Sequence, residues 1–258
     1  MNRTGPAGAG WQITETEELP STNTVLKEMA RQGAPAGTVL VARRQTAGRG
    51  RMGRSFYSPP ETGLYLSVLL RPDCLPEDAL HLTVTAAVAA CRSGEAVCGN
   101  RVDIKWVNDL FRDGKKVCGI LTEGETDPLT GRLSFAICGL GFNLCPPERG
   151  FPPELKEIAG GLSEEWDPGL RDRLLRAFLE EFRHCLAEPR GSVMEEYRRR
   201  SVLIGKSVFS PEGAFEGNAE VLDVDGDGGL VLRLGTGEIR TLTAGEVSVR
   251  LSRKESEE

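Results

Sequence analysis

The strongest constraint on the fold is a series of short apolar runs, each bounded by glycine, proline or charged residues. The runs occupy residues 38–42, 64–70, 102–107, 117–122 and 133–140. Their lengths and their β-branched residues predict buried strands. Apolar residues with helical spacing predict helices at 21–33, 76–93, 170–185 and 193–200. The main part of the chain is therefore expected to contain both strands and helices.

The pattern changes at about Ser201. From Lys206 onward, short alternating runs are separated by glycine-rich turns at intervals of roughly ten residues, which predicts a small β-barrel or sandwich. We therefore expect four parts in the chain. They are a flexible N-terminal arm at 1–17, a main domain at 18–200, a small β domain at 201–252 and a charged tail at 253–258.

Composition excludes several classes of protein. The chain has 258 residues, 39% hydrophobic and 27% charged, which is ordinary for a globular protein and excludes disorder of the whole chain. No run approaches the ~18 apolar residues of a membrane span, and residues 1–10 lack the apolar core of a signal peptide. The seven cysteines form no C-x-x-C pair, which argues against a disulfide scaffold or a zinc site. These observations predict a cytoplasmic protein with buried thiols.

Histidine is scarce, whereas arginine is concentrated in one segment. The two histidines, His81 and His184, lie in no catalytic motif, so histidine-based catalysis is unpromising. The net charge is −6, yet five arginines fall within twelve residues that contain no acidic side chain: Arg43, Arg44, Arg49, Arg51 and Arg54. Local positive charge in an acidic protein favours a small anionic ligand over a nucleic acid.

The sequence Q-T-A-G-R-G-R-M-G-R at residues 45–54 is the sharpest local feature. Its three glycines allow the backbone to approach a ligand closely and to turn N–H groups toward an anion. Its arginines are multidentate phosphate donors. A flexible nucleic-acid-binding segment or a solvated turn is the alternative, and composition alone divides the two about evenly. The position between two predicted strands, and the lack of an aromatic residue among the arginines, argue against the nucleic-acid segment.

Two further motifs combine charged or amide groups with predicted strands. In D-I-K-W-V-N-D, residues 103–109, Asn108 can bind a polar ligand edge and Asp109 can hold Mg²⁺ or another cation. A plain hairpin turn with Trp106 in the core is the alternative. In G-K-K-V-C-G-I-L, residues 114–121, a lysine at the mouth of a buried strand can fix a carboxylate or a phosphate. The alternative there is that the lysines only solubilise the start of the strand.

A fourth motif, G-L-G-F-N at residues 139–143, places an amide at the end of a glycine-containing strand. Together with S-T-N at 21–23 and in their order along the chain, these motifs resemble the biotin–protein ligases, also called biotin–[acetyl-CoA-carboxylase] ligases. The resemblance covers residues of about 18–252, and G-R-G-R-x-G-R is its most specific part. It implies an α+β fold, in which helices flank a mixed β-sheet, shared with lipoate ligases, and a small C-terminal all-β, barrel-like domain.

The resemblance also implies a two-step, ATP-dependent reaction. Biotin and MgATP give biotinyl-5′-AMP and pyrophosphate, and the biotinyl group then moves to one lysine of a biotin carboxyl carrier domain of a biotin-dependent carboxylase. Biotin, ATP and Mg²⁺ are then substrates or accompany them, and no tightly bound metal or prosthetic group is expected.

Site residues follow from the resemblance motif by motif. The catalytic residues are expected to be Lys116, Arg49 and Arg51. Biotin is expected to contact Ser21, Thr22, Asn23, Gln45, Arg49, Gly50, Arg51, Lys116 and Gly119. The nucleotide is expected to contact Gly48, Arg49, Arg51, Gly53, Arg54, Trp106, Asn108 and Asn143. Asp109 is the expected metal ligand.

Departures from the family pattern limit what can be carried over. Val107 stands where the family usually has proline, and Phe56 where tryptophan is frequent. We expect both changes to preserve the chemistry. About twenty residues precede Ser21, too few for a helix-turn-helix domain, so the chain is expected not to bind operator DNA or a membrane. An exposed sheet edge could pair with a second copy in a homodimer or with the carrier domain.

Three alternative functions stay open from the sequence. The nearest is a lipoate or octanoate ligase of the same fold, although the arginine–glycine segment, K-W-V-N-D and the β-rich C-terminal part favour biotin. A nucleic-acid-binding module would use the arginines of 43–54, but the net negative charge disfavours it. A catalytically silent homologue that only docks to carrier domains is the third.

Overall fold

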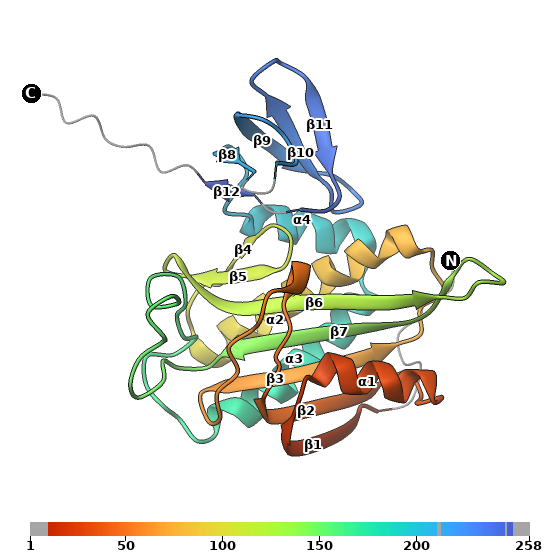
Figure 1. Ribbon diagram of the computed structural model, residues 1–258, viewed down its shortest axis with the longest axis vertical. Helices are drawn as coiled ribbons and strands as arrows, with labels where there is room; N and C mark the ends of the chain where they lie inside the picture. The colour runs from red at the N-terminus through yellow and green to blue at the C-terminus, as the bar shows by residue number, and fades with distance from the viewer. Residues whose placement is uncertain (1–9, 211–212, 246, 250–258) are drawn as a thin grey trace, which may run out of the picture.

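The apolar runs of the sequence form the central strands of a seven-stranded sheet. The computed structural model describes residues 10–210, 213–245 and 247–249. The strands of this sheet are β1 (Gln12–Leu19), β2 (Thr38–Gln45), β3 (Gly63–Leu70), β4 (Asp103–Lys105), β5 (Asp109–Arg112), β6 (Lys115–Thr126) and β7 (Leu133–Asn143). Their order across the sheet is β1-β2-β3-β7-β6-β5-β4 (Figure 1). Because β1 runs parallel to β2 while the other neighbours are antiparallel, the sheet is mixed, and the predicted α+β fold is confirmed.

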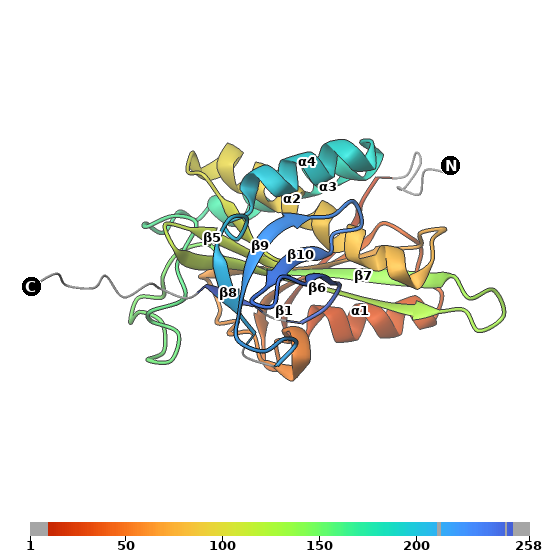
Figure 2. The same cartoon turned by 90° about the horizontal axis from the view of Figure 1, so that it is seen from above.

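Helices cover both faces of this sheet. The helices are α1 (Thr22–Arg31), α2 (Ala79–Cys98), α3 (Leu170–Ala187) and α4 (Arg190–Arg200), with short 3-10 turns η1 (Arg51–Gly53) and η2 (Pro76–Asp78). Helix α1 lies on one face, whereas α2 and α3 lie on the other and α4 packs against α2 (Figure 2). In the part of the chain that the structure describes, no helix combines the length and apolar character needed to cross a bilayer.

The two faces of the sheet bury different residues because side chains alternate along a strand. Val39 and Val41 of β2 belong to the apolar cluster under α2 and α3, whereas Leu40 between them belongs to the cluster under α1. Phe135 and Ile137 of β7 also lie under α1. Because both faces of the sheet are buried, the central strands are continuous apolar runs in the sequence.

The apolar surface under α1 stops part-way along the sheet. Leu69 of β3 pairs with Ile137 of β7, and the next pair on the same face is Ser67 with Gly139. Gly141 follows two residues further along β7. A polar residue and two residues without side chains therefore occupy the part of this face that lies at the N-terminal end of α1. The functional cleft described below lies there.

Strand β1 corrects the predicted N-terminal arm. Residues 12–17 of the arm predicted at 1–17 form most of this edge strand, whereas residues 1–9 lie outside the described residues. The strand is mostly exposed and carries several acidic residues, so it has no apolar alternation that sequence patterns could detect. Its pairing with β2 and the ion pairs of Glu15 with Arg43 and of Glu18 with Arg44 hold it in place.

Two other boundaries differ from the predicted ones. Strand β2 continues to Gln45, so the arginines at 43 and 44 belong to a strand and not to the predicted loop. The strand predicted at 102–107 ends at Lys105, and a turn at 106–108 leads into the unpredicted strand β5, which begins at Asp109. The register of β5 on β6 explains this arrangement, because Asp109 pairs with Gly119 across the ladder.

The C-terminal part forms a five-stranded antiparallel sheet, as predicted. Its strands are β8 (Ser207–Phe209), β9 (Asn218–Val224), β10 (Leu230–Leu234), β11 (Ile239–Leu242) and β12 (Ser248–Val249). The Nε1 atom of Trp106 donates a hydrogen bond of 2.8 Å to the carbonyl of Gly228 in the β9–β10 turn. Apolar residues of both sheets belong to one continuous cluster. The domain boundaries at 18, 200 and 252 stay predictions, and the predicted tail at 253–258 lies outside the described residues.

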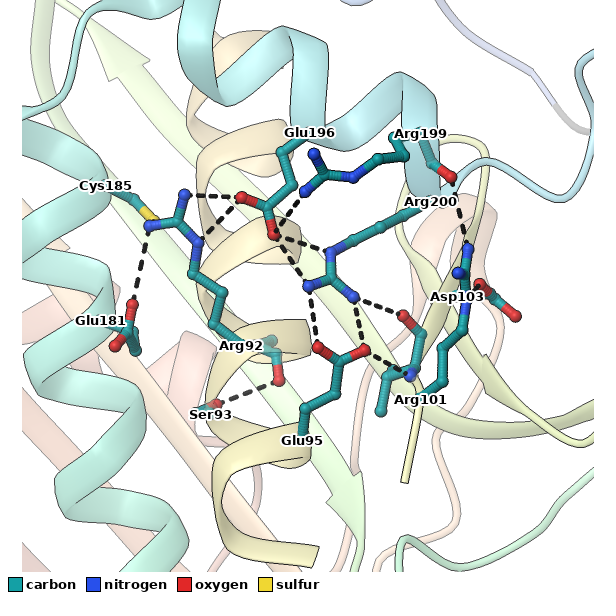
Figure 3. Close-up of polar contacts among 12 residues, drawn as sticks. Arg92, Ser93, Glu95, Arg101, Asp103, Glu181, Cys185, Glu196, Arg199 and Arg200 are labelled. Carbon is teal, nitrogen blue, oxygen red and sulfur yellow. Dashed lines mark hydrogen bonds and ion pairs between the residues drawn. The ribbon is translucent and has the colours of Figure 1, made fainter. Parts of the chain in front are cut away.

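An ionic cluster joins α2, α3 and α4 on the far side of the sheet from the cleft (Figure 3). Arg92 of α2 pairs with Glu188 at 2.5 Å and with Glu196 of α4 at 2.6 Å. Arg200, at the end of α4, pairs with Glu95 at 2.6 Å and donates to the carbonyl that precedes β4. The cluster therefore fixes the end of α4 against β4.

Candidate functional site

A cleft on the α1 face of the sheet collects most of the residues that the sequence singled out. The N-terminus of α1, the ends of β6 and β7, the segment between β2 and β3 and the β4–β5 turn surround it. The predicted site residues that line it are Ser21, Thr22, Asn23, Gln45, Arg49, Gly50, Arg51, Arg54, Trp106, Asn108, Asp109, Lys116 and Gly119.

One group of side chains in the cleft lining is polar but uncharged. Ser21, Thr22 and Asn23 are buried at the start of α1, and within the described part of the chain the Ser21 side chain caps no backbone N–H. Gln45 Oε1 accepts a hydrogen bond of 2.8 Å from the Thr22 N–H and lies 3.2 Å from the hydroxyl oxygen of the same residue. The S-T-N motif therefore presents its side chains to the cleft and to β3.

Glycines in β7 provide the space for these side chains. A Cβ atom built at Gly139 would lie 1.9 Å from Oδ1 of Asn23, and one at Gly141 would lie 2.4 Å from the ring of Phe56. Both distances are far below van der Waals contact. The G-L-G motif thus allows Asn23 and Phe56 to lie directly on the sheet.

The cleft is also cationic. Arg49, Arg51, Arg54, Lys105 and Lys116 line it, against the single carboxylate of Asp109 among the described lining residues. Arg51 Nη1 donates a hydrogen bond of 3.2 Å to Oδ1 of Asn108, whose own amide donates to the carbonyl of Ile120 at 2.8 Å. This concentration of positive charge in an acidic protein gives the cleft affinity for anions.

Lys116 is held from several directions at the start of β6. Its Nζ atom lies 2.6 Å from Oδ1 of Asp109. Its backbone N–H donates to the carbonyl of Ile158 at 2.7 Å, and its carbonyl accepts from the N–H of Gly160 at 2.9 Å. The loop at 145–168 therefore contributes two backbone bonds that fix the position of this lysine.

Three predicted site residues lie outside the lining of the cleft and act on it indirectly. Asn143 Nδ2 donates to the carbonyl of Lys116 at 3.3 Å. A Cβ at Gly48 would lie 2.4 Å from the carbonyl oxygen of Phe56, so this glycine permits a close crossing of the loop. Gly53 has a φ of +75°, in the left-handed region that favours glycine. The predicted nucleotide contacts of these residues stay predictions.

The buried thiol nearest to the lysine has no nucleophilic character. Burial raises the pKa of the Cys118 thiol well above its ordinary value, and this effect outweighs the opposing effect of Lys116. Cys118 therefore stays protonated at neutral pH, and chemistry in the cleft rests on its fixed cations.

Comparison with known proteins identifies the family. Residues 16–143 match the Biotin/lipoate A/B protein ligase family, and residues 212–250 match the Biotin protein ligase C terminal domain. The bifunctional ligase/repressor BirA of Bacillus spizizenii is 35% identical over 86% of this chain and 70% of its own. The biotin–[acetyl-CoA-carboxylase] ligase of Mycobacterium tuberculosis is 32% identical over 93% of this chain and 90% of its own. The chain belongs to the biotin protein ligase family.

A solved structure agrees with this membership. The biotin protein ligase of Aquifex aeolicus, in complex with biotin and ATP, aligns with a TM-score of 0.75 and 28% identity over 93% of this chain and 99% of its own. Membership in the biotin protein ligase family makes the chain an ATP-dependent ligase, and it favours neither the lipoate ligase nor the nucleic-acid-binding module.

The sequence motifs of the biotin protein ligases did not include several residues of the site. Lys105 and Gly245 line the cleft, and Ser67 and Glu123 hold its side chains by hydrogen bonds. A single serine within the apolar run of β3 was the available signal for Ser67. Glu123 offered none, because its partners Asn23 and Arg49 are remote in the sequence.

The predicted metal ligand has a different partner. Asp109 forms the ion pair with Lys116, and the described residues contain no group of three His, Cys, Asp or Glu side chains that could hold a metal ion. The cleft therefore offers one carboxylate at most to Mg²⁺, whose usual protein sites include one or two carboxylates together with substrate phosphates. The assignment of Asp109 stays a prediction.

Proposed function

We propose that this ligase activates biotin with MgATP to form biotinyl-5′-AMP and then transfers the biotinyl group to one lysine of a biotin carboxyl carrier domain. The observation that carries the proposal is that uncharged polar side chains and fixed cations line the same cleft. Biotin has groups that match both, since its ureido ring is neutral and its carboxylate is charged. One relative named above is a biotin–[acetyl-CoA-carboxylase] ligase, and the similar Aquifex aeolicus structure is a complex with biotin and ATP.

In the first step, the biotin carboxylate attacks the α-phosphorus of ATP. A new P–O bond forms, the bond from the α-phosphorus to the bridging oxygen breaks, and pyrophosphate leaves. Both reactants are anions, so the cations of the cleft reduce their repulsion and stabilise charge on the transferring oxygens. We assign this role to Lys116, Arg49 and Arg51, because all three line the cleft. Among the described residues, their side chains contact carboxylates or an amide and no imidazole or thiol, so what they contribute is a fixed positive charge.

In the second step, the amine of the acceptor lysine attacks the carbonyl carbon of the mixed anhydride. A C–N bond forms, the C–O bond to AMP breaks, and the amine loses a proton. Two glycines of the segment at 48–54 flank Arg49, so this segment can close over the adenylate and protect it from water. We assign the carrier domain as the macromolecular partner, whereas pairing with a second copy stays a prediction.

Mg²⁺ would enter with ATP and neutralise phosphate charge during the first step. Asp109 is the lining carboxylate available to contact it, and it would have to exchange its ion pair with Lys116 to do so. We also propose that the enzyme works in the cytoplasm. All seven cysteines are free thiols, and five of them are buried, as expected in a reducing compartment.

The proposal is tested with the purified chain, ATP, Mg²⁺ and a purified biotin carboxyl carrier domain. Mass spectrometry should detect the addition of one biotinyl group to the carrier, and replacement of the acceptor lysine by arginine should abolish it. Absence of the mass increase from well-folded enzyme would contradict the proposal. Equal modification by lipoate would retain the ligase chemistry but reject the assignment of biotin.

A further inference from the structure

One carboxylate contacts both the uncharged and the cationic side chains of the cleft lining. Oε2 of Glu123, on β6, accepts a hydrogen bond of 2.9 Å from Nδ2 of Asn23 and one of 3.0 Å from Nη1 of Arg49. Asn23 belongs to the uncharged polar group and Arg49 to the cationic group. The side chain of Glu123 is only 19% exposed, so its negative charge is poorly screened by water.

The hydrogen bonds of Asn23 have a fixed direction. Its Nδ2 donates to Glu123 and, at 3.0 Å, to the carbonyl of Leu121; both partners are acceptors, which settles the orientation of the amide. Its Oδ1 therefore accepts from Oγ of Ser67 at 2.6 Å. A hydroxyl carries one proton, so Ser67 must accept, at 2.7 Å, from the hydroxyl of Thr22. The chain from Glu123 to Thr22 thus leaves the lone pairs of the Thr22 hydroxyl free to accept from a ligand.

Arg49 has few other restraints. Its side chain is 45% exposed. The residue lies between Gly48 and Gly50, and its backbone forms an isolated antiparallel β-bridge with Ser55. The ion pair with Glu123 therefore decides which direction its guanidinium takes. The same carboxylate oxygen sets the amide of Asn23, so one residue determines the direction of both an amide and a guanidinium group of the cleft lining.

We infer that Glu123 is a positioning residue for biotin binding, which aligns Arg49 with the biotin carboxylate and fixes Asn23 and Thr22 toward the ureido ring. The inference rests on the proposed function. Glu123→Ala removes both of its hydrogen bonds, whereas Glu123→Gln retains an acceptor for Asn23 and removes only the charge that holds Arg49.

Glu125 provides a matched control. It lies two residues further along the same strand, and its partners, Arg31 and Lys27, belong to the exposed side of α1 away from the cleft. Glu125→Gln changes the same chemical group on the same strand without a contact to Asn23 or Arg49.

The experiment measures the dissociation constant of biotin by calorimetry for the wild type and the variants, with melting curves to verify folding. Loss of charged hydrogen bonds should raise the constant about tenfold or more in Glu123→Ala, and by a smaller factor in Glu123→Gln. Glu125→Gln should stay within about twofold of the wild type. In an Arg49→Ala background, Glu123→Gln should have almost no further effect, because the partner that it releases is already absent.

Two results would overturn the inference. One is biotin binding by folded Glu123→Ala that is equal to that of the wild type. The other is an effect of Glu123→Gln that is as large without Arg49 as with it, since that is the behaviour of a purely structural residue. Failure of the wild type itself to bind biotin would instead reject the proposed function, and this inference with it.

Discussion

The Nζ atom of Lys116 lies 2.6 Å from Oδ1 of Asp109, and the two residues come from neighbouring strands, β6 and β5. The lysine is about one-third exposed and the carboxylate one-quarter exposed, so both groups face the cleft. The ion pair holds the ammonium group in place before any substrate binds. Removal of the lysine therefore takes away a cation that is already oriented, which is the kind of donor that contributes most to catalysis.

The first prediction concerns this lysine. Lys116→Ala should lower the rate of adenylate formation by about a hundredfold or more, because a preoriented donor stabilises charge on the transferring phosphate. Lys115→Ala is the matched control, since the ammonium of Lys115 contacts Glu157 and backbone carbonyls outside the cleft lining. Pyrophosphate–ATP exchange measures both rates. Comparable losses in the two variants would point to a general disturbance of β6.

The second prediction separates the arginines of the segment at 43–54. Arg51 contacts Asn108 in the cleft, whereas Arg44 pairs with Glu18 of β1. Arg51→Ala should reduce adenylate formation by about a hundredfold or more, and Arg44→Ala should leave it within about twofold, as expected for an exposed ion pair. Steady-state exchange rates at saturating biotin and ATP provide the comparison. Near-wild-type turnover of Arg51→Ala would reject its assigned role.

The third prediction tests the space above β7. In Gly139→Ala the new methyl group would overlap Oδ1 of Asn23, so the amide must move and biotin binding should weaken by about tenfold or more. Gly191→Ala is the control, because no described atom lies within 4 Å of a Cβ built at that position in α4. Biotin titrations of both variants measure the effect. Unchanged affinity in Gly139→Ala would mean that Asn23 makes no contact with biotin.

The fourth prediction concerns pH and the ionic cluster of α2 and α4. Burial acts to raise the pKa of Glu196, but hydrogen bonds from Arg92 and Arg200 outweigh it and hold the pKa below its ordinary value. A carboxyl group with a lowered pKa in the folded state stabilises the fold above its unfolded pKa of about 4.3, and this contribution is lost as the pH falls through the folded value.

Glu196→Gln should therefore be less stable than the wild type at pH 7, by about 1–3 kcal/mol. The difference should shrink as the pH falls from about 5 toward 3, because the wild type then loses its charge as well. Urea denaturation at several pH values measures both free energies of unfolding. A difference that is constant over this pH range would show that the charge of Glu196 contributes nothing to stability.

The central strands and the helices could be predicted because each carries its own apolar period. Val39, Val41 and Leu40 of β2 reveal a strand that is buried on both faces, whatever the rest of the chain does. Strand β1 could not be predicted, because its residues gain their stability from pairing with β2 and from ion pairs with remote arginines. Its own sequence has no apolar period to detect.

The same distinction applies to the site. Motifs singled out Lys116, Arg49 and Arg51, since local glycines and lysines mark such segments, and the fold brings all three to one cleft. Their catalytic roles stay predictions. The role of Glu123 depends on β6 bringing it beside Asn23, which is one hundred residues away in the sequence. Contacts of this kind arise only from the fold.

The most direct test of the assigned chemistry is pyrophosphate–ATP exchange in the presence of Mg²⁺, measured with biotin, with lipoate and without added acid. We expect exchange that requires biotin, because uncharged polar side chains and fixed cations line the same cleft, as the proposed contacts with the ureido ring and with the carboxylate and phosphates require. Exchange with lipoate in place of biotin would contradict the assigned substrate. The absence of exchange with either acid, in folded protein freed of bound adenylate, would contradict adenylation itself.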